Sequence, residues 1–208
     1  MAGWKKRFED LACEIESHAL LKLDRFELGA PASDAEIEKA AGAAGGSLPQ
    51  GMPELYGEAG SVRLEWSMRA DTWHRPGGPP SGAVNLLPLV DRSDAIFGSW
   101  RDVIWFSDDD RYRHVAPFDL FTPESGAVLY PVPGATMVHY HTLGEELFST
   151  GRTFEEYVEL LFAARGYLYW PTSLCVEEQE SFEVESFRAD LPTIFGQSTA
   201  QLFRPTGQ

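Results

Sequence analysis

The sequence predicts an α+β fold in one domain, with a mainly antiparallel sheet of about five to six strands and helices packed against it. Two segments begin with a capping box and continue with apolar residues at helical spacing, which indicates helices. Between them lie short β-prone runs separated by turn residues, an order that favours sequential antiparallel strands. The 208-residue chain is 43% hydrophobic, so it can bury one sizeable core.

The first predicted element is an amphipathic helix near the N-terminus. Apolar residues recur every three or four positions from Trp4 to Leu23, which is the spacing of one helical face. We expect this helix, within residues 1–30, to stand beside a domain core that spans residues 33–170. An acidic C-terminal extension, residues 171–208, is expected to follow the core.

Two helices are predicted at the start of that core. Ser33 and Glu36 form a capping box, and the glycines at 45–46 supply the left-handed residue that ends helices. Pro53 at a first-turn position predicts a short helical segment over residues 52–56.

The predicted strands are short and close together. Residues 62–66 alternate like a strand, whereas residues 75–82 are rich in Pro and Gly and are predicted to form an exposed loop. Further β-prone runs cover residues 84–90, 103–106, 117–121, 128–130 and 136–141. Strands in this order predict an antiparallel meander.

The last predicted helix has the clearest pattern. Thr153 and Glu156 form a second capping box, and five apolar residues from Phe154 to Phe162 share one face. Gly166 ends this helix, and residues 167–170 follow as an aromatic strand or edge.

Charge limits the classes of partner. The formal net charge of −15 repels nucleic-acid phosphates and anionic membranes but attracts a basic partner. From Glu145 to Glu185 ten glutamates stand against two arginines, so this stretch is a candidate docking surface, with simple solvation as the ordinary alternative.

The compartment is expected to be the cytoplasm. The N-terminal residues have no uninterrupted apolar run of a secretory signal, and no apolar run reaches the roughly 18 residues that span a bilayer. Cys13 and Cys175 lack the spacing of a zinc or redox motif and are expected to be buried free thiols.

Three stretches resemble the SUKH superfamily, which joins a fungal cell-wall-assembly regulator to many bacterial toxin-immunity proteins. The first is residues 33–66, from the capped helix through Leu48-Pro49 to the alternating strand. The others are residues 103–121, with an acidic turn between two strands, and the closing helix over residues 154–170. The loop at 75–82 is longer than a minimal member needs.

The resemblance implies a non-catalytic α+β domain that neutralises a toxin. Such a domain needs no cofactor. A nucleic-acid-cleaving toxin, with its basic surface, would suit the charge of this chain, and an intracellular regulatory scaffold is a further alternative. The candidate partner-binding residues are Glu155, Glu159, Glu177, Glu178, Glu180, Asp108 and Asp109.

A competing reading is a small metal-dependent enzyme that resembles cupins. His139 and His141 are two apart on a predicted strand, so they face the same side, and Glu145 would add the carboxylate of a site for iron, manganese or nickel. Gly134 is one residue too close to His139 for the cupin motif, and no histidine follows His141.

Other chemistries lack their motifs. The acidic run 108–110 does not have the alternating ligands of an EF-hand and is expected to be a solvated turn. Neither a nucleophile elbow nor a phosphate-binding glycine loop occurs.

Overall fold

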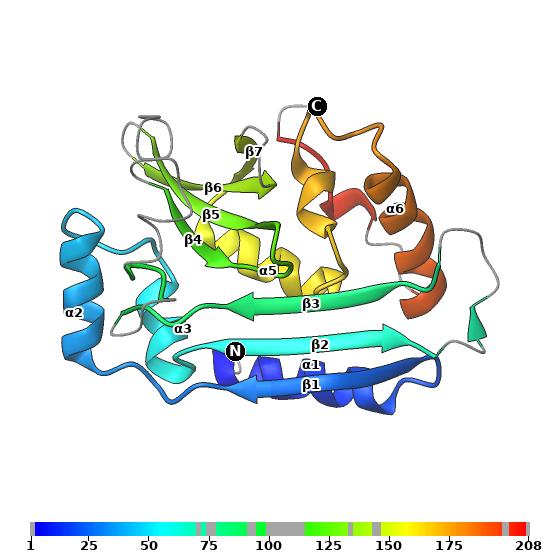
Figure 1. Cartoon of the computed structure of the whole chain (residues 1–208), viewed down its shortest axis with the longest axis horizontal. Coiled ribbons are helices and arrows are strands. Elements are labelled where there is room, and N and C mark those ends of the chain that lie inside the picture. The colour runs from blue at the N-terminus through cyan, green and yellow to red at the C-terminus, as the bar shows by residue number, and fades with distance from the viewer. Residues whose placement is uncertain are drawn as a thin grey trace.

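The chain folds around one seven-stranded sheet with helices packed on it (Figure 1). The computed structural model describes residues 3–69, 72–73, 78–90, 95–98, 115–132, 135–142, 147–196 and 200–206. The strands follow the chain in the order β1 to β7, and each neighbouring pair is antiparallel. The α+β class and the meander are therefore confirmed, whereas the expected count of five to six strands is wrong.

The elements have the following bounds. The strands are β1 Leu21–Leu28, β2 Val62–Met68, β3 Ser81–Leu86, β4 Ala116–Asp119, β5 Ser125–Val132, β6 Ala135–Thr142 and β7 Leu147–Arg152. The α-helices are α1 Trp4–Ser17, α2 Asp34–Ala43, α3 Met52–Glu58, α5 Phe154–Ala164 and α6 Phe182–Phe195. Two short 3-10 helices are η2 Trp170–Leu174 and η3 Ala200–Leu202.

The N-terminal segment differs from its prediction. α1 ends at Ser17, whose Oγ donates to the carbonyl of Cys13, and His18 has extended backbone angles. Leu21 and Leu23, which continued the helical spacing in the sequence, lie on β1 and pair with β2. The described residues 3–30 therefore contain a helix and a strand, and both are integral to the fold, because β1 pairs with β2 and Phe8 of α1 is fully buried in the core.

Both capping boxes are confirmed. The backbone N–H of Ser33 donates to Glu36 Oε2 at 2.7 Å, and the Glu36 N–H donates to Ser33 Oγ at 3.3 Å. Thr153 and Glu156 form the same pair of bonds at 2.9 and 3.4 Å. Each box satisfies two amide donors that a helix start would otherwise leave free.

The predicted loop at 75–82 is wrong for its last two residues, which begin β3. Gly82 pairs with Trp66, and a Cβ there would stand 2.1 Å from the indole nitrogen of that residue. This position of the strand requires a glycine, because the indole of Trp66 lies too close to leave room for a side chain. The strand expected at 103–106 lies outside the described residues.

Two further expectations change. Tyr167 makes only an isolated bridge to Gly82, and the aromatic segment continues as η2 instead of a strand. Cys175 is buried as expected, but Cys13 is exposed on α1.

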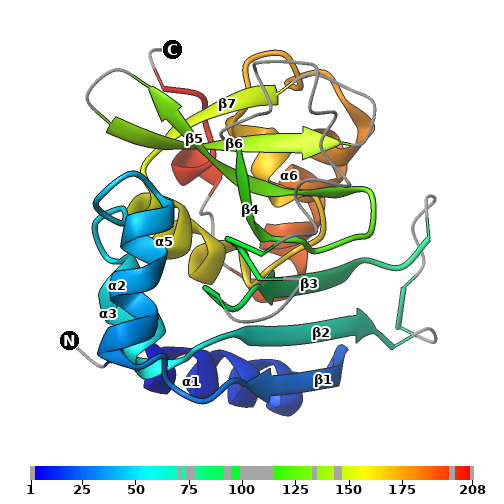
Figure 2. The same ribbon diagram turned by 60° about the vertical axis from the view of Figure 1, so that its left-hand side comes forward.

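The sheet has two parts that meet at β3 and β4. The only described register pair between those strands is Leu86 with Asp119. Figures 1 and 2 show strands β1 to β3 diverging from the curved strands β4 to β7, with α5 and α6 beside them. The hydrophobic core includes the largest fully buried side chains, Trp66 and Trp170. Among the described helices, none combines the length and apolar composition needed to cross a bilayer.

Candidate functional site

A groove with a volume of about 400 Å³ lies beside α6. Its walls come from α6 as far as Asp190, from residues 167–169 after α5, and from residue 73 and residues 78–81, which lead into β3. The aromatic residues among them are Trp73, Tyr167, Tyr169 and Phe182. This volume is within the usual range of roughly 300–1,000 Å³ for ligand sites. We call it the α6 groove.

The sequence of α6 determines which side chains reach the groove. Ser181 caps the helix, and its Oγ accepts the N–H of Val184 at 3.3 Å. Val184 and Phe187 are buried, so the remaining positions of the first turns face outward. Phe182 is consequently 63% exposed, which is unusual for so large an apolar side chain.

The floor of the groove is held by a buried hydrogen bond. The Tyr167 hydroxyl donates to Asp190 Oδ2 at 2.9 Å, and both residues are less than a tenth exposed. Burial raises the pKa of Tyr167, and the bond to Asp190 raises it further. Tyr167 therefore remains a neutral donor at physiological pH and ties α6 to the segment after α5.

The groove is acidic. Its described lining includes Glu183, Glu185 and Asp190 but neither Lys nor Arg. A low-dielectric wall that carries charge of one sign concentrates the field in front of it. The groove is therefore suited to a cationic, partly apolar ligand group, such as an arginine or lysine side chain.

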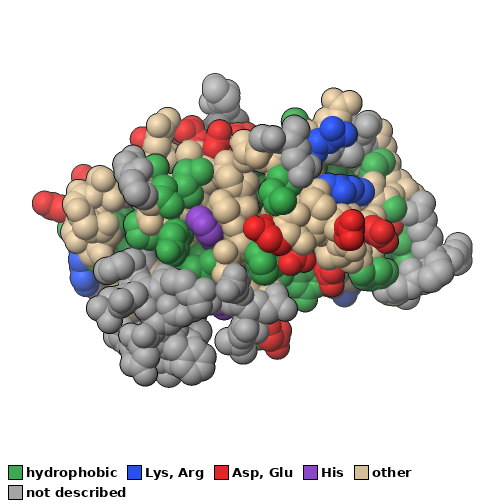
Figure 3. Space-filling model, turned by 90° about the horizontal axis from the view of Figure 1, so that it is seen from above, with side chains coloured by type: hydrophobic (Ala, Val, Ile, Leu, Met, Phe, Trp, Pro, Cys, Tyr) green, Lys and Arg blue, Asp and Glu red, His purple; other side chains and the backbone are tan. Residues whose placement is uncertain are grey.

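An acidic turn, Glu177–Glu180, adjoins this groove. Gln179 Nε2 donates to the carbonyl of Cys175 at 2.6 Å and so fixes the turn to the end of η2. Glu177 and Glu180 are exposed, and two exposed apolar residues, Val176 and Phe182, flank the turn. Figure 3, which looks down on the upper face of Figure 1, shows acidic side chains beside hydrophobic ones, with a few basic ones nearby.

The structure divides the expected docking glutamates between two places. Glu177, Glu178 and Glu180 gather on the acidic turn, whereas Glu155 and Glu159 lie on α5. Asp108 and Asp109 are outside the described residues.

The two candidate docking glutamates on α5, Glu155 and Glu159, already have protein partners. Gln50 Nε2 donates to Glu155 at 2.9 Å, and Arg7 donates to both carboxylate oxygens of Glu159 at 2.6 and 2.7 Å. The hydrogen bonds from Arg7 lower the pKa of Glu159. Glu159 therefore joins α1 to α5, and the acidic turn is the better candidate for an external partner.

The proposed metal ligands are partly described. His139 and His141 lie on the same face of β6, His139 packs on Tyr130 with ring centroids 4.8 Å apart, and His141 is 8% exposed. Burial lowers the pKa of His139 and lowers that of His141 to about 4, so both rings are neutral at pH 7, as metal ligation requires. Glu145 lies outside the described residues, within which no cluster of three metal-ligating side chains occurs.

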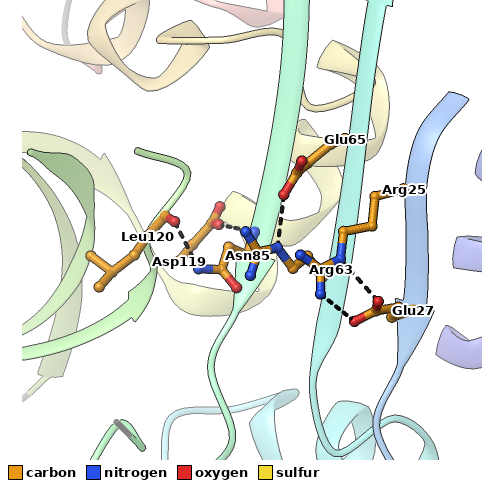
Figure 4. A network of polar contacts seen from close by, with 7 residues as sticks. All are labelled: Arg25, Glu27, Arg63, Glu65, Asn85, Asp119 and Leu120. Carbon is orange, nitrogen blue, oxygen red and sulfur yellow. Dashed lines mark hydrogen bonds and ion pairs between the residues drawn. The ribbon is translucent and has the colours of Figure 1, made fainter. Parts of the chain in front are cut away.

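A buried carboxylate at the joint of the sheet was not anticipated from the sequence. Asp119 is 1% exposed and accepts the N–H of Asn85 at 2.8 Å and the hydroxyl of Tyr157 at 2.9 Å. Asn85 Nδ2 donates in turn to the carbonyl of Leu120 at 2.9 Å (Figure 4). Burial raises the pKa of Asp119 to about 6. These bonds link β3, β4 and α5.

The groove was also missed, although its signals are present in the sequence. Ser181 is a good N-cap, and Val184, Phe187, Leu191 and Ile194 have helical spacing. That pattern predicts α6 and leaves Phe182 outside its apolar face. What local sequence does not indicate is that Trp73 and Tyr169 line the same groove as Phe182.

No known protein family, curated protein or solved structure matches this chain. The chain is thus an acidic α+β protein whose described residues form an aromatic and acidic groove, and the likeness to the SUKH superfamily remains an expectation from the sequence.

Proposed function

We propose that this chain is a non-catalytic domain that captures a basic protein partner with the α6 groove and the acidic turn. The observation that carries the proposal is the exposed Phe182 at a groove whose described lining has three carboxylates and no basic side chain. Aromatic anchors surrounded by polar residues are typical of binding hot spots.

The energetics favour such a partner. Burying a Phe side chain contributes roughly 1.5–3 kcal/mol, and this contribution is unused while Phe182 faces water. The net charge of −15 raises the encounter rate with a basic protein by about 10- to 1,000-fold. The acidic turn then provides charge complementarity next to the apolar anchor.

The resemblance to the SUKH superfamily supports a toxin as the partner, with this chain as its neutraliser. A nucleic-acid-cleaving toxin presents a basic surface to its own substrate, and an acidic protein that covers this surface would block it. An intracellular regulatory scaffold would use the same groove for a basic partner of the cell.

The test is capture of partners by the tagged protein from its native cell, followed by mass spectrometry. A stoichiometric basic protein should bind, and Phe182→Ala or reversal of Glu177, Glu178 and Glu180 to Lys should abolish binding. The matched control reverses Glu16, Glu38 and Glu54, which are exposed elsewhere and change the net charge equally. An equal loss of partner binding in both triple variants would show that net charge alone causes the loss. That outcome would reject the α6 groove and the acidic turn as the binding site.

A metal-dependent enzyme is the second candidate, because two neutral imidazoles lie on one face of β6. Purified protein would then contain stoichiometric metal, and His139→Ala or His141→Ala would remove it. Metal-free protein that does not take up iron, manganese or nickel on titration would reject this candidate.

A further inference from the structure

β1 is an edge strand of eight residues, with β2 as its only described neighbour in the sheet. In Figures 1 and 2 it borders the sheet on the side away from β4 to β7. The outer side of an edge strand presents unpaired N–H and C=O groups, which can template pairing with another strand. The identity of such a strand can be inferred from the side chains of β1.

A bulge controls how those side chains point. Leu23 pairs with Trp66 and Arg25 with Glu65, so Asp24 is an extra residue between them. The extra residue places Asp24 and Arg25 on the same outer face. Two ion pairs agree with this arrangement, since Lys22 contacts Asp24 at 2.6 Å and Arg25 contacts Glu27 at 2.9 Å.

The strand is complementary to itself in reverse. An antiparallel second copy centred between Asp24 and Arg25 aligns the following pairs: Leu21 with Leu28, Lys22 with Glu27, Leu23 with Phe26, and Asp24 with Arg25. Every polar pair joins opposite charges, and every apolar pair joins apolar residues. In a regular strand the two members of such pairs would point to opposite faces, but the bulge brings them to the same face.

We propose that β1 pairs antiparallel with β1 of a second copy, so that one sheet continues through a two-fold symmetric dimer. The half-buried Leu23, Phe26 and Leu28 gain apolar cover from the second copy. Opposite charges directly across two strands stabilise pairing, and each pair occurs twice because of the symmetry.

Charged residues on an edge strand often serve the contrary purpose of preventing association. Charges of one sign would do so here, whereas the four charges of β1 attract a second copy at each position. The net charge of −15 on each copy opposes association, but physiological salt screens charges beyond about 8 Å, and cross-strand neighbours are closer than that.

The test is sedimentation equilibrium of the full chain at physiological salt. The wild type should dimerise. Asp24→Arg places like charges opposite each other at both symmetric positions, and so does Arg25→Asp, so each variant alone should weaken the dimer by about tenfold or more. A 1:1 mixture of the two should form heterodimers, and the double variant Asp24→Arg/Arg25→Asp should form homodimers again.

The matched control is the exchange of another adjacent exposed pair, Glu38→Arg and Lys39→Asp on α2, which should leave the dimer unchanged. Recovery in the mixture also shows that the single variants fold. A monomeric wild type at millimolar concentration, or a dimer that is insensitive to Asp24→Arg, would overturn the proposal. The α6 groove is formed by elements other than β1. The test of partner capture by the groove is therefore independent of the result of the dimer test.

Discussion

Asp119 and His141 are buried residues whose pKa values shift in opposite directions across almost the same pH range. Burial raises the pKa of Asp119 from 3.8 to about 6 and lowers that of His141 from 6.5 to about 4. Between pH 4 and 6 folded Asp119 holds a proton that the unfolded chain releases, so its contribution to stability falls as pH rises. Over the same range unfolded His141 binds a proton that the folded protein excludes, so its contribution rises with pH.

Replacing Asp119 should expose the effect of His141. Asp119→Asn keeps an acceptor for the Asn85 N–H but removes the titration, so acidification from pH 6 to 4 should lower the free energy of unfolding by about 2–3 kcal/mol more than in the wild type. Urea unfolding at several pH values measures this difference. His141→Gln should shift the profile in the opposite sense, and parallel profiles for all three proteins would contradict the assignment.

At the scale of elements, α1 is joined to α5 through Arg7. Its guanidinium forms the bidentate pair with Glu159 and lies 4.7 Å from the ring centroid of Trp4 and 4.2 Å from that of Phe162. Its side chain is 24% exposed, so water screens it less than an ordinary surface charge. Arg7 should thus contribute more to stability than one partner of an exposed ion pair does, because it also stacks on two aromatic rings.

Arg7→Ala should therefore lower the free energy of unfolding by about 1–2 kcal/mol, beyond the 0–1 kcal/mol of exposed pairs. Arg7→Lys should restore little of this loss, because an ammonium group cannot make the planar double contact. Chemical denaturation of the variants measures both effects. Lys6→Ala is the control, since its pair with Asp10 is exposed and should contribute almost nothing.

At the scale of the whole molecule, the charge of −15 should act mainly on the rate of partner binding. We expect the association rate constant for the captured partner to fall at least tenfold between about 20 and 500 mM salt, with a much smaller change in the dissociation rate. Surface plasmon resonance across a salt series separates the two. A rate that is indifferent to salt would exclude electrostatic steering.

The elements predicted from local signals were largely found. The boxes at Ser33 and Thr153 act within four residues, and turn residues between short strands leave little choice but a meander. β1 and β7 were missed for different reasons. Leu21 and Leu23 fit a helical face as well as a strand, so the predicted helix extends into β1. β7 buries only Thr150, so its sequence lacks the alternation of apolar and polar residues that indicates a strand.

The sequence by itself determined the α+β class, the antiparallel order, the capped helices and the acidic charge, because each depends on composition or on residues that are neighbours in the chain. Tertiary structure decided where α1 ends, why position 82 must be a glycine, and that Phe182 and Trp73 line one groove. It also decided that Asp119 is buried between Asn85 and Tyr157. These features arise from contacts between residues far apart in the chain, whose energies local patterns do not contain.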